Sequence, residues 1–243
     1  DSVKSAIKSV DTIFHLAALI GIPYSYVSPL AYLRTNIEGT YNVLQSALES
    51  NIDNLMITST SETYGTAQYI PIDEKHIAVG QSPYSATKIS ADEIALSYYR
   101  SFNLPVKIVR PFNTYGPRQS SRAIIPTVIS QLLEGNTELH LGNLTPTRDL
   151  TFVKDTAKGF YEIAKAEKLI GGATNIAMMN EISISNLVSI IGKLIGSDFK
   201  IISEDKRIRP KNSEVERLFG DNSKILNATS WEPDYDLNTG LQE

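Results

Sequence analysis

The first half of the chain alternates short apolar runs with longer stretches of helical periodicity. Three apolar runs, at residues 10–18, 54–59 and 106–112, have the length of buried strands. Apolar residues recur at three- and four-residue spacing over 33–51 and 84–103, which predicts two long helices. Strands that alternate with helices of this length favour a parallel sheet in an α/β fold.

The pattern becomes less regular from about residue 119. A helix is predicted over 124–133, and two more over 155–167 and 183–195, where Ser183 precedes an apolar run as a helix cap would. Short strands are predicted between these helices, near 138–142, 151–153, 174–177 and 199–203. We therefore expect a main domain over 1–118. A smaller lobe over 119–243 would send some of its elements back to that domain.

Composition narrows the range of functions. The net charge of −4 gives no general attraction to nucleic acid or anionic membranes, and the absence of cysteine excludes disulfides and thiolate chemistry. His15, His76 and His140 lack metal-ligand spacing, so we expect no metal site. No apolar run is long enough to cross a membrane and no signal peptide is visible. A soluble, cytoplasmic protein is the expectation.

The strongest chemical candidate combines a strand end with a helix start. The strand over 54–59 delivers Ser59, Thr60, Ser61 and Glu62 to its carboxyl end, and Tyr84 opens the helix with Lys88 one turn along. A nearby ammonium favours the phenolate, so Lys88 is expected to lower the pKa of Tyr84. With Thr60 bound to the same substrate oxygen, this arrangement predicts alcohol oxidation by hydride transfer.

Tyr161 and Lys165 repeat the same spacing and show that spacing alone is weak. They lie in an ordinary amphipathic helix pattern, and no cluster of hydroxyl side chains at a strand end accompanies them. We interpret this second pair as a solvated helix face. The context of Tyr84, rather than its distance from a lysine, carries the prediction.

Ligands of open parallel sheets bind outside the carboxyl ends of the strands. The segments 15–18, 59–62 and 111–113 all fall there. The alanines in the first segment indicate either close helix packing or the approach of a flat ligand. Arginine often lies on the surface, but several arginines in one lobe would suit a diphosphate. The C-terminal half carries Arg122, Arg148, Arg207, Arg209 and Arg217.

Taken together, the motifs resemble those of the extended short-chain dehydrogenase/reductases, which include NAD-dependent nucleotide-sugar epimerases and dehydratases. The matching segments are 15–18, 35–40, 59–65, Tyr84 with Lys88, 110–118, 148–155 and 231–233. The resemblance implies a Rossmann-like, doubly wound parallel sheet and NAD as cofactor. The family's first strand and glycine-rich turn do not precede residue 1. We therefore expect a fragment that lacks roughly the first 50 to 60 residues of a family member.

The resemblance also implies roles for individual residues. Tyr84 would be the base that takes a sugar hydroxyl proton, Lys88 would hold the cofactor ribose, and Thr60 would orient the sugar hydroxyl. The remaining cofactor contacts would be Ala17, Ala18, Ser59 and Pro111. The positions that match contacts to the nucleotide diphosphate or its surroundings are Asn113, Arg122, Arg148 and Arg217. Arg34 and the helices near 33–50 and 84–102 match the family's usual homodimer interface, a four-helix bundle.

The triplet Thr60-Ser61-Glu62 bears on the reaction. Sugar 4,6-dehydratases of the family commonly carry Thr-Asp-Glu, where Asp expels the C6 hydroxyl and Glu removes the C5 proton. Ser61 is a poor proton donor, whereas Glu62 is present. The same triplet also resembles that of nucleoside-diphosphate glucuronate decarboxylases, and a 4-epimerase needs no such carboxylate.

Three longer segments, 83–88, 110–119 and 144–150, resemble N-acetylglucosamine-nucleotide 4,6-dehydratases of the legionaminic-acid pathway type. This favours a dehydratase that oxidises C4, removes water across C5–C6 and returns hydride to C6. The alternative of another class is a non-catalytic binding protein with this fold, or an inactive fragment. Intact Thr60, Glu62, Tyr84 and Lys88 argue against it for the parent protein, whereas for the fragment it stays open because the phosphate-binding turn is missing.

Overall fold

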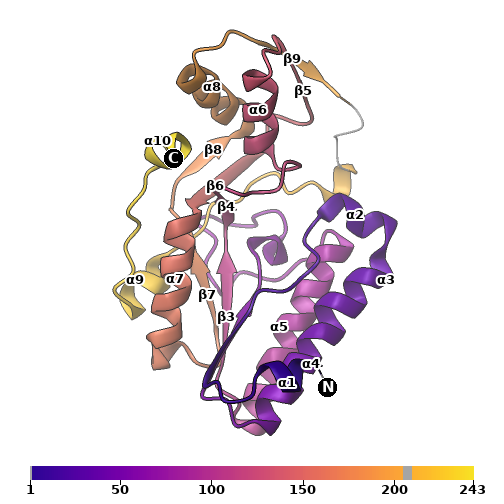
Figure 1. The fold of residues 1–243 in the computed structure, drawn as a ribbon, viewed down its shortest axis with the longest axis vertical. Helices are drawn as coiled ribbons and strands as arrows, with labels where there is room; N and C mark the ends of the chain where they lie inside the picture. Colours follow the sequence, from indigo (N-terminus) through magenta and orange to yellow (C-terminus); the bar gives the residue numbers. More distant parts are fainter. Residues whose placement is uncertain (1, 205–209) are drawn as a thin grey trace.

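A four-stranded parallel sheet forms the centre of the molecule in the computed structural model, which describes residues 2–204 and 210–243 (Figure 1). The register places Ile57 opposite Ile108 and Val109 opposite Thr174. The strands, in spatial order, are β1 (Thr12–His15), β2 (Asn54–Thr58), β3 (Val106–Pro111) and β7 (Ala173–Ile176). The α/β class and its parallel sheet are confirmed.

Helices cover both faces of this sheet (Figure 1). Side chains alternate along a strand, so Leu55 and Ile57 of β2 join the core under one helical layer, while Met56 joins the core under the other. The first layer contains α4 (Gly39–Glu49) and α5 (Pro83–Phe102), and the second contains α7 (Val153–Lys165) and α9 (Ser223–Ala228). Burial on both faces explains why the strands read as continuous apolar runs.

Helix α5 matches the helix predicted over 84–103, and its caps explain where it begins and ends. The Ser82 hydroxyl accepts from the Ser85 amide, and the Ser85 hydroxyl lies 3.0 Å from the Ser82 amide, which makes a reciprocal cap. Pro83 occupies the first turn, where its missing N–H is not needed. Asn103 ends the helix in the left-handed region at φ 56°. The cap fixes Tyr84 in the first turn of α5.

The helix predicted over 33–51 is more complex than its pattern indicates. Two short helices precede it, and its own first part is a π-helix, in which one extra residue widens the turn. Local apolar spacing does not reveal either feature. These elements, with the N-terminal helix, are α1 (Ser2–Ala6), α2 (Ile22–Val27), α3 (Pro29–Tyr32) and η1 (Leu33–Glu38).

The C-terminal half builds two smaller sheets above the edge where β1–β3 end (Figure 1). One joins β4 (Asn113–Tyr115), β6 (Thr147–Phe152) and β8 (Glu181–Ser183), with β4 parallel and β8 antiparallel to β6. The other joins β5 (Glu138–Leu141) and β9 (Lys200–Ser203) in parallel. Helices α6 (Ile124–Leu133), α8 (Ile184–Ile195) and α10 (Leu237–Gln242) pack around them.

The predicted helices of this half are confirmed, and Ser183 caps α8 by accepting from the Asn186 amide. Strand β6 starts at Thr147, earlier than predicted, and β4 and β8 were not predicted. The short 3-10 helices are η2 (Ser61–Tyr64), η3 (Glu167–Leu169) and η5 (Lys211–Ser213). Within residues 2–204 and 210–243, no helix is both long and apolar enough to cross a membrane.

Candidate active site

The carboxyl ends of β1, β2 and β3 meet at one edge of the central sheet, facing the C-terminal lobe. Thr60 follows β2 and caps η2, because its Oγ1 accepts from the Glu62 amide at 3.2 Å. This cap turns the chain sharply at the strand end. Thr60 and Glu62 are therefore both held at the edge where ligands of such sheets bind.

Tyr84 lies against this turn. Its hydroxyl forms a hydrogen bond with the Thr60 side chain, and its ring meets the Tyr32 ring edge-on at 6.3 Å between centroids. Tyr84 is 6% exposed and packs in a small cluster with Ile22 and Tyr32. The structure thus brings together the tyrosine and the threonine that the sequence assigned to one substrate oxygen.

The expected lowering of the Tyr84 pKa is not what the structure shows. Burial raises the pKa of the Tyr84 phenol above its ordinary value; the Thr60 hydrogen bond opposes the rise, and the Glu62 carboxylate adds to it. The Tyr84 pKa is raised because desolvation disfavours the phenolate more strongly than neighbouring groups stabilise it. A cation bound close to Tyr84 would act in the opposite direction.

Lys88 lies one turn after Tyr84, and its ammonium points to the end of β2. The Nζ atom donates to the Thr58 carbonyl at 2.6 Å, and the residue is 3% exposed. Burial lowers the pKa of Lys88, and the carboxylate of Asp92 opposes that shift. Lys88 is thus held at the strand edge, next to the position expected for a cofactor.

Ser61 and Glu62 differ in their surroundings. Ser61 is 2% exposed within η2, so its hydroxyl is not presented to solvent. Glu62 is half-buried, and its charge acts on the Tyr84 phenol. Of the two, Glu62 is the better placed to exchange a proton with a ligand at this edge.

The cofactor positions predicted from the sequence also fall along this edge. Ala17 is exposed and Ala18 half-buried just after β1, and Pro111 closes β3. Ser59 follows β2 and donates its hydroxyl to Asp92 at 2.8 Å. These side chains are small, so a flat ring can approach the backbone here.

Asn36 is a buried polar residue of this region that lies in the matching segment 35–40 but was given no role from the sequence. Its amide exchanges hydrogen bonds with both backbone groups of Leu19, at 2.8 and 3.0 Å, and donates to the Thr87 hydroxyl at 3.0 Å. Thr87 in turn donates to the Tyr84 carbonyl at 2.7 Å. Asn36 therefore ties the loop after β1 to the first turn of α5.

His15, at the end of β1, is neutral in this environment. Burial, with a smaller effect of Lys88, lowers its pKa to about 4. Its Nε2 lies 3.1 Å from the Thr40 hydroxyl, which itself donates to the Asn36 carbonyl. Because that hydroxyl hydrogen is used, Nε2 carries the proton of the neutral ring. His15 is thus a structural hydrogen-bond donor rather than a proton acceptor.

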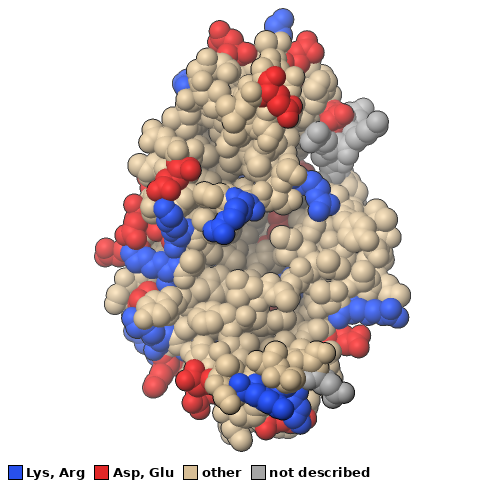
Figure 2. All heavy atoms as spheres, viewed as in Figure 1, with Lys and Arg blue, Asp and Glu red and all other residues tan. Residues whose placement is uncertain are grey.

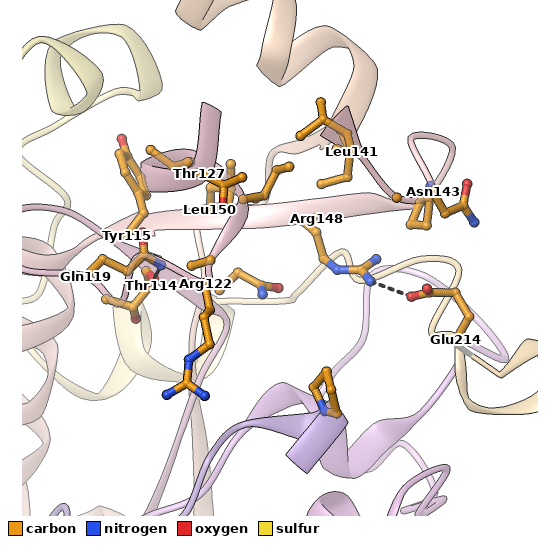
Figure 3. A pocket seen from close by; sticks show the side chains of 18 residues that line it. Thr114, Tyr115, Gln119, Arg122, Thr127, Leu141, Asn143, Arg148, Leu150 and Glu214 are labelled. Atoms are coloured by element: carbon orange, nitrogen blue, oxygen red, sulfur yellow. Dashed lines mark hydrogen bonds and ion pairs between the residues drawn. The ribbon is translucent and has the colours of Figure 1, made fainter. Parts of the chain in front are cut away.

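A cavity of about 460 Å³ lies between the C-terminal lobe and α2 (Figure 3). Three residues predicted to contact the substrate, Asn113, Arg122 and Arg148, are among its lining residues. Figure 2 shows the molecule hollowed near its middle, with Lys and Arg side chains on two sides of the hollow. This cavity has the size of a small-ligand site.

Arg148 is held firmly in the wall of this cavity. Its guanidinium donates to the Thr147 carbonyl at 2.8 Å and to the Glu214 carboxylate at 3.2 Å (Figure 3). Arg122 is exposed and extends into the same space from the segment before α6. Asn113 and Gln119 each keep a buried side-chain oxygen with no hydrogen-bond partner among the described residues. The wall thus offers both cationic donors and unused acceptors.

The other predicted arginines are placed differently. Arg217 does not line this cavity, and its guanidinium is bound to both carboxylate oxygens of Glu181. Arg207 and Arg209 lie outside the described residues. Among the described residues, no group of three or more His, Cys, Asp or Glu side chains could hold a metal ion.

Comparison with known proteins places this geometry in a family. The family model described as GDP-mannose 4,6 dehydratase matches residues 1–243. The UDP-N-acetyl-alpha-D-glucosaminuronate decarboxylase of Bacillus cytotoxicus is 30% identical over 253 residues, which cover 100% of this chain and 78% of that relative.

Two solved structures are similar in fold and sequence. The UDP-glucuronic acid 4-epimerase of Bacillus cereus, in complex with UDP-glucuronic acid and NAD, superposes with a TM-score of 0.91 at 27% identity, covering 100% of this chain and 76% of that one. The dTDP-glucose 4,6-dehydratase DesIV of Streptomyces venezuelae, solved with NAD, gives 0.89 at 26% identity, covering 99% and 73%. The chain belongs to the GDP-mannose 4,6 dehydratase family, and thus to the extended short-chain dehydrogenase/reductases that comprise nucleotide-sugar dehydratases, epimerases and decarboxylases.

Proposed function

We propose that this protein is an NAD-dependent nucleotide-sugar 4,6-dehydratase that acts on a nucleoside-diphosphate N-acetylglucosamine. The reaction oxidises C4, removes water across C5–C6 and returns hydride to C6. The observation that carries the proposal is that Thr60 joins Glu62 to Tyr84: its hydroxyl accepts from the Glu62 amide at 3.2 Å and its side chain hydrogen-bonds to the Tyr84 phenol. The reaction needs two proton-transfer groups at one sugar, and this edge supplies both.

Each residue has a defined task in this reaction. Tyr84 takes the proton of the C4 hydroxyl, and Thr60 holds the same oxygen through the hydroxyl that now bonds to Tyr84. Glu62 removes the C5 proton once C4 is a ketone, because the ketone makes that proton acidic. Ser61, buried in η2, supports the turn, and the C6 hydroxyl leaves with a proton from Glu62 or water.

The residues at the sheet edge fit a nicotinamide cofactor. Ala17, Ala18 and Pro111 leave room against the backbone at the strand ends, while Lys88 and Ser59 supply polar contacts there. NAD, when bound, supplies the hydride acceptor and donor. The oxidised nicotinamide ring is cationic, and beside Tyr84 it would offset the burial that raises the Tyr84 pKa.

The cavity beside this edge fits the nucleoside diphosphate. Arg148 and Arg122 provide guanidinium donors for the phosphates, and Asn113 offers an unused buried oxygen to a donor of the ligand. Arg217 is occupied by Glu181, so its assignment to the diphosphate stays a prediction.

Mass spectrometry of the product tests the proposal. The protein is incubated with NAD and UDP- or GDP-linked N-acetylglucosamine, glucose or glucuronic acid. Loss of about 18 Da indicates dehydration, loss of about 44 Da decarboxylation, and an unchanged mass with a new sugar indicates 4-epimerisation. The dehydratase proposal requires the first outcome with an N-acetylglucosamine nucleotide, and either of the others overturns it.

Decarboxylation is the second candidate, because the relative from Bacillus cytotoxicus is a decarboxylase at 30% identity. Oxidation at C4 of a glucuronic acid gives a β-keto acid that loses CO2 without an acid at C6. Buried Ser61 is compatible with that route. A 4-epimerase is the third candidate, since UDP-glucuronic acid 4-epimerase has the same fold. A protein that binds nucleotide sugars without turnover is the remaining alternative.

A homodimer is part of the proposal. A shallow groove on η1, α4 and α5 is lined by Leu33, Arg34, Ile37, Glu38, Tyr41 and Ile94. Leu33 and Tyr41 are 47% and 46% exposed, although both are apolar or aromatic. A second copy packing the same helices would form a four-helix bundle. Light scattering should give a dimer for the wild type and a monomer for Ile37→Asp.

A further inference from the structure

A fully buried carboxylate lies two helical turns after Tyr84 on α5 and has no task in the reaction described above. Asp92 is on α5, one turn after Lys88, and is 1% exposed. Its Oδ2 atom accepts from the Ser59 hydroxyl at 2.8 Å and from two nitrogens of Arg110 at 3.0 and 3.2 Å. Asp92 therefore connects α5 to the carboxyl ends of β2 and β3.

The partner of this carboxylate is permanently charged. Arg110 is buried on β3, and its guanidinium lies over the Tyr64 ring at 4.9 Å. A guanidinium does not lose its proton in proteins, so the matching form of Asp92 is the carboxylate. Burial raises the pKa of Asp92, and Arg110 and Ser59 oppose that rise.

The second oxygen of Asp92 takes no part in the bonds to Ser59 and Arg110. Oδ1 is buried and has no hydrogen-bond partner among the described residues. Lys88 precedes Asp92 by one helical turn, which places both side chains on one face of α5. The Lys88 ammonium is buried and donates to the Thr58 carbonyl. A buried ammonium and a half-satisfied buried carboxylate thus lie on the same helix face, each lowering the cost of charging the other.

We propose that Asp92 is a positioning residue, whose buried carboxylate keeps Lys88, one turn after Tyr84 on α5, in its charged form. The proposal rests on the proposed function in one respect: Tyr84 and Lys88 are taken to act on the sugar and the cofactor. Arg110 and Ser59 hold the carboxylate in place, and Lys88 is the cation that depends on its charge.

Among the described residues, two titratable groups act on Lys88. Asp92 acts on it from α5 and His15 from the end of β1, and Arg110 of β3 is paired with Asp92. His15, with a pKa of about 4, is neutral above that pH and adds no charge. Asp92 is therefore the carboxylate whose charge opposes the desolvation of Lys88.

Loss of the Asp92 charge should lower the pKa of both Lys88 and Tyr84. Without the carboxylate, Lys88 loses its proton at lower pH, because the buried ammonium has no compensating charge. The pKa of Tyr84 also falls, since the Asp92 charge contributes to its rise. Activity increases with deprotonation of Tyr84 and decreases with deprotonation of Lys88. Both limbs of the pH–rate profile of Asp92→Asn should therefore move to lower pH.

Lysine titration by NMR tests this without turnover. The protein is labelled with 13C at lysine Cε, and the Lys88 resonance is identified as the one missing from Lys88→Met. Asp92→Asn should lower the Lys88 pKa by about 1 unit or more, and Asp92→Glu, which keeps the charge, should restore most of it. A shift of less than about 0.3 unit in Asp92→Asn overturns the proposal.

Asp155→Asn is the matched control. Asp155 is another fully buried carboxylate, on α7, and it accepts from the Asp234 and Tyr235 amides. Its replacement should destabilise the fold and leave the Lys88 titration unchanged; an equal Lys88 shift in this control also overturns the proposal. If Asp92→Asn does not fold, Asp92→Asn combined with Arg110→Gln removes the ion pair without leaving an isolated guanidinium. A smaller lowering is expected there, because a cation is lost together with the carboxylate, and an unchanged or raised Lys88 pKa overturns the proposal.

The outcome is separable from that of the proposed function. The titration needs neither substrate nor NAD, so it can succeed in a protein that shows no dehydration. In that case the role of Asp92 toward Lys88 holds and the dehydratase proposal fails. Dehydration with an unshifted Lys88 titration supports the dehydratase proposal and overturns the role of Asp92.

Discussion

Replacing Glu62 with glutamine should separate the two halves of the proposed reaction. Glu62 is half-buried on η2 and close enough to Tyr84 for its charge to raise the phenol pKa. Glutamine keeps the size of the side chain but cannot take the C5 proton. Oxidation at C4, which depends on Tyr84 and Thr60, should continue, whereas loss of water should stop.

The size of the rate effects follows from two roles of the Glu62 carboxylate: it is the proposed C5 base, and its charge raises the Tyr84 pKa. Loss of a positioned general base costs about 10²- to 10⁴-fold in rate, or about 3–5 kcal/mol in the barrier to dehydration. The first step responds in the opposite sense. Removing a negative neighbour lowers the pKa of Tyr84, so oxidation should begin at lower pH in Glu62→Gln than in the wild type.

Rapid mixing with substrate provides the assay. Absorbance near 340 nm follows reduced nicotinamide, and mass spectrometry follows the sugar. Glu62→Gln should accumulate about one equivalent of reduced nicotinamide per active site, with almost no dehydrated product, because hydride cannot return to C6. The wild type should accumulate much less.

A matched variant controls for a general effect of carboxylate loss. Glu74 is also half-buried with a pKa raised by burial, and it accepts from the Asn175 amide. Glutamine can still accept that bond, so Glu74→Gln should turn over normally. Dehydration by Glu62→Gln at the wild-type rate would refute the assignment of the C5 base.

Four further outcomes are expected. Tyr84→Phe should lower turnover by about 10²- to 10⁴-fold with little change in nucleotide affinity by calorimetry, whereas Tyr161→Phe, 60% exposed, should have no effect. Arg148→Met should weaken nucleoside diphosphate binding by about 10-fold or more in the same calorimetry, because a charged donor is lost from the cavity wall. Gly159→Ala should cost about 1–3 kcal/mol in urea unfolding, since the added Cβ would lie 2.7 Å from a core methyl group. Burial raises the pKa of Asp149 to about 7, so its contribution to stability is greatest below its unfolded pKa and is lost as the pH rises through 7. Between pH 4 and 7, the free energy of unfolding in urea should therefore fall more for the wild type than for Asp149→Asn as the pH rises.

The sequence predicted those parts of the fold whose determinants are local. The helix predicted over 84–103 is α5 (Pro83–Phe102), whose caps act within one turn, and the apolar run of β2 is continuous because both its faces are buried. Strand β8 was missed because its three residues pair with Thr147, Arg148 and Asp149, far earlier in the chain. No local pattern encodes such a pairing.

In the candidate site, too, the features with local determinants were predicted and those set by tertiary contacts were not. Thr60 and Tyr84 were identified because each follows a recognisable strand end or helix start. The direction of the Tyr84 pKa was wrong, because it depends on burial beneath Tyr32, which spacing along α5 does not contain. Asp92 was visible only as a polar position one turn after Lys88. Its importance depends on Arg110, which reaches it from another strand.

The domain division at residue 118, the cytoplasmic location and the dimer stay predictions. The pairing of β3 with β7 bears on the first of these, because a strand from the second half of the chain completes the central sheet.

The hydrogen bonds of Asn36 couple the loop after β1 to the position of the Tyr84 hydroxyl. The Asn36 side-chain amide hydrogen-bonds to the Leu19 backbone and to Thr87, which bonds to the Tyr84 carbonyl in the first turn of α5. A ligand that displaces residues 17–19 would therefore also displace the Tyr84 hydroxyl. Cutting this link, as in Asn36→Ala, would let the loop at residues 17–19 and the Tyr84 hydroxyl move independently of each other.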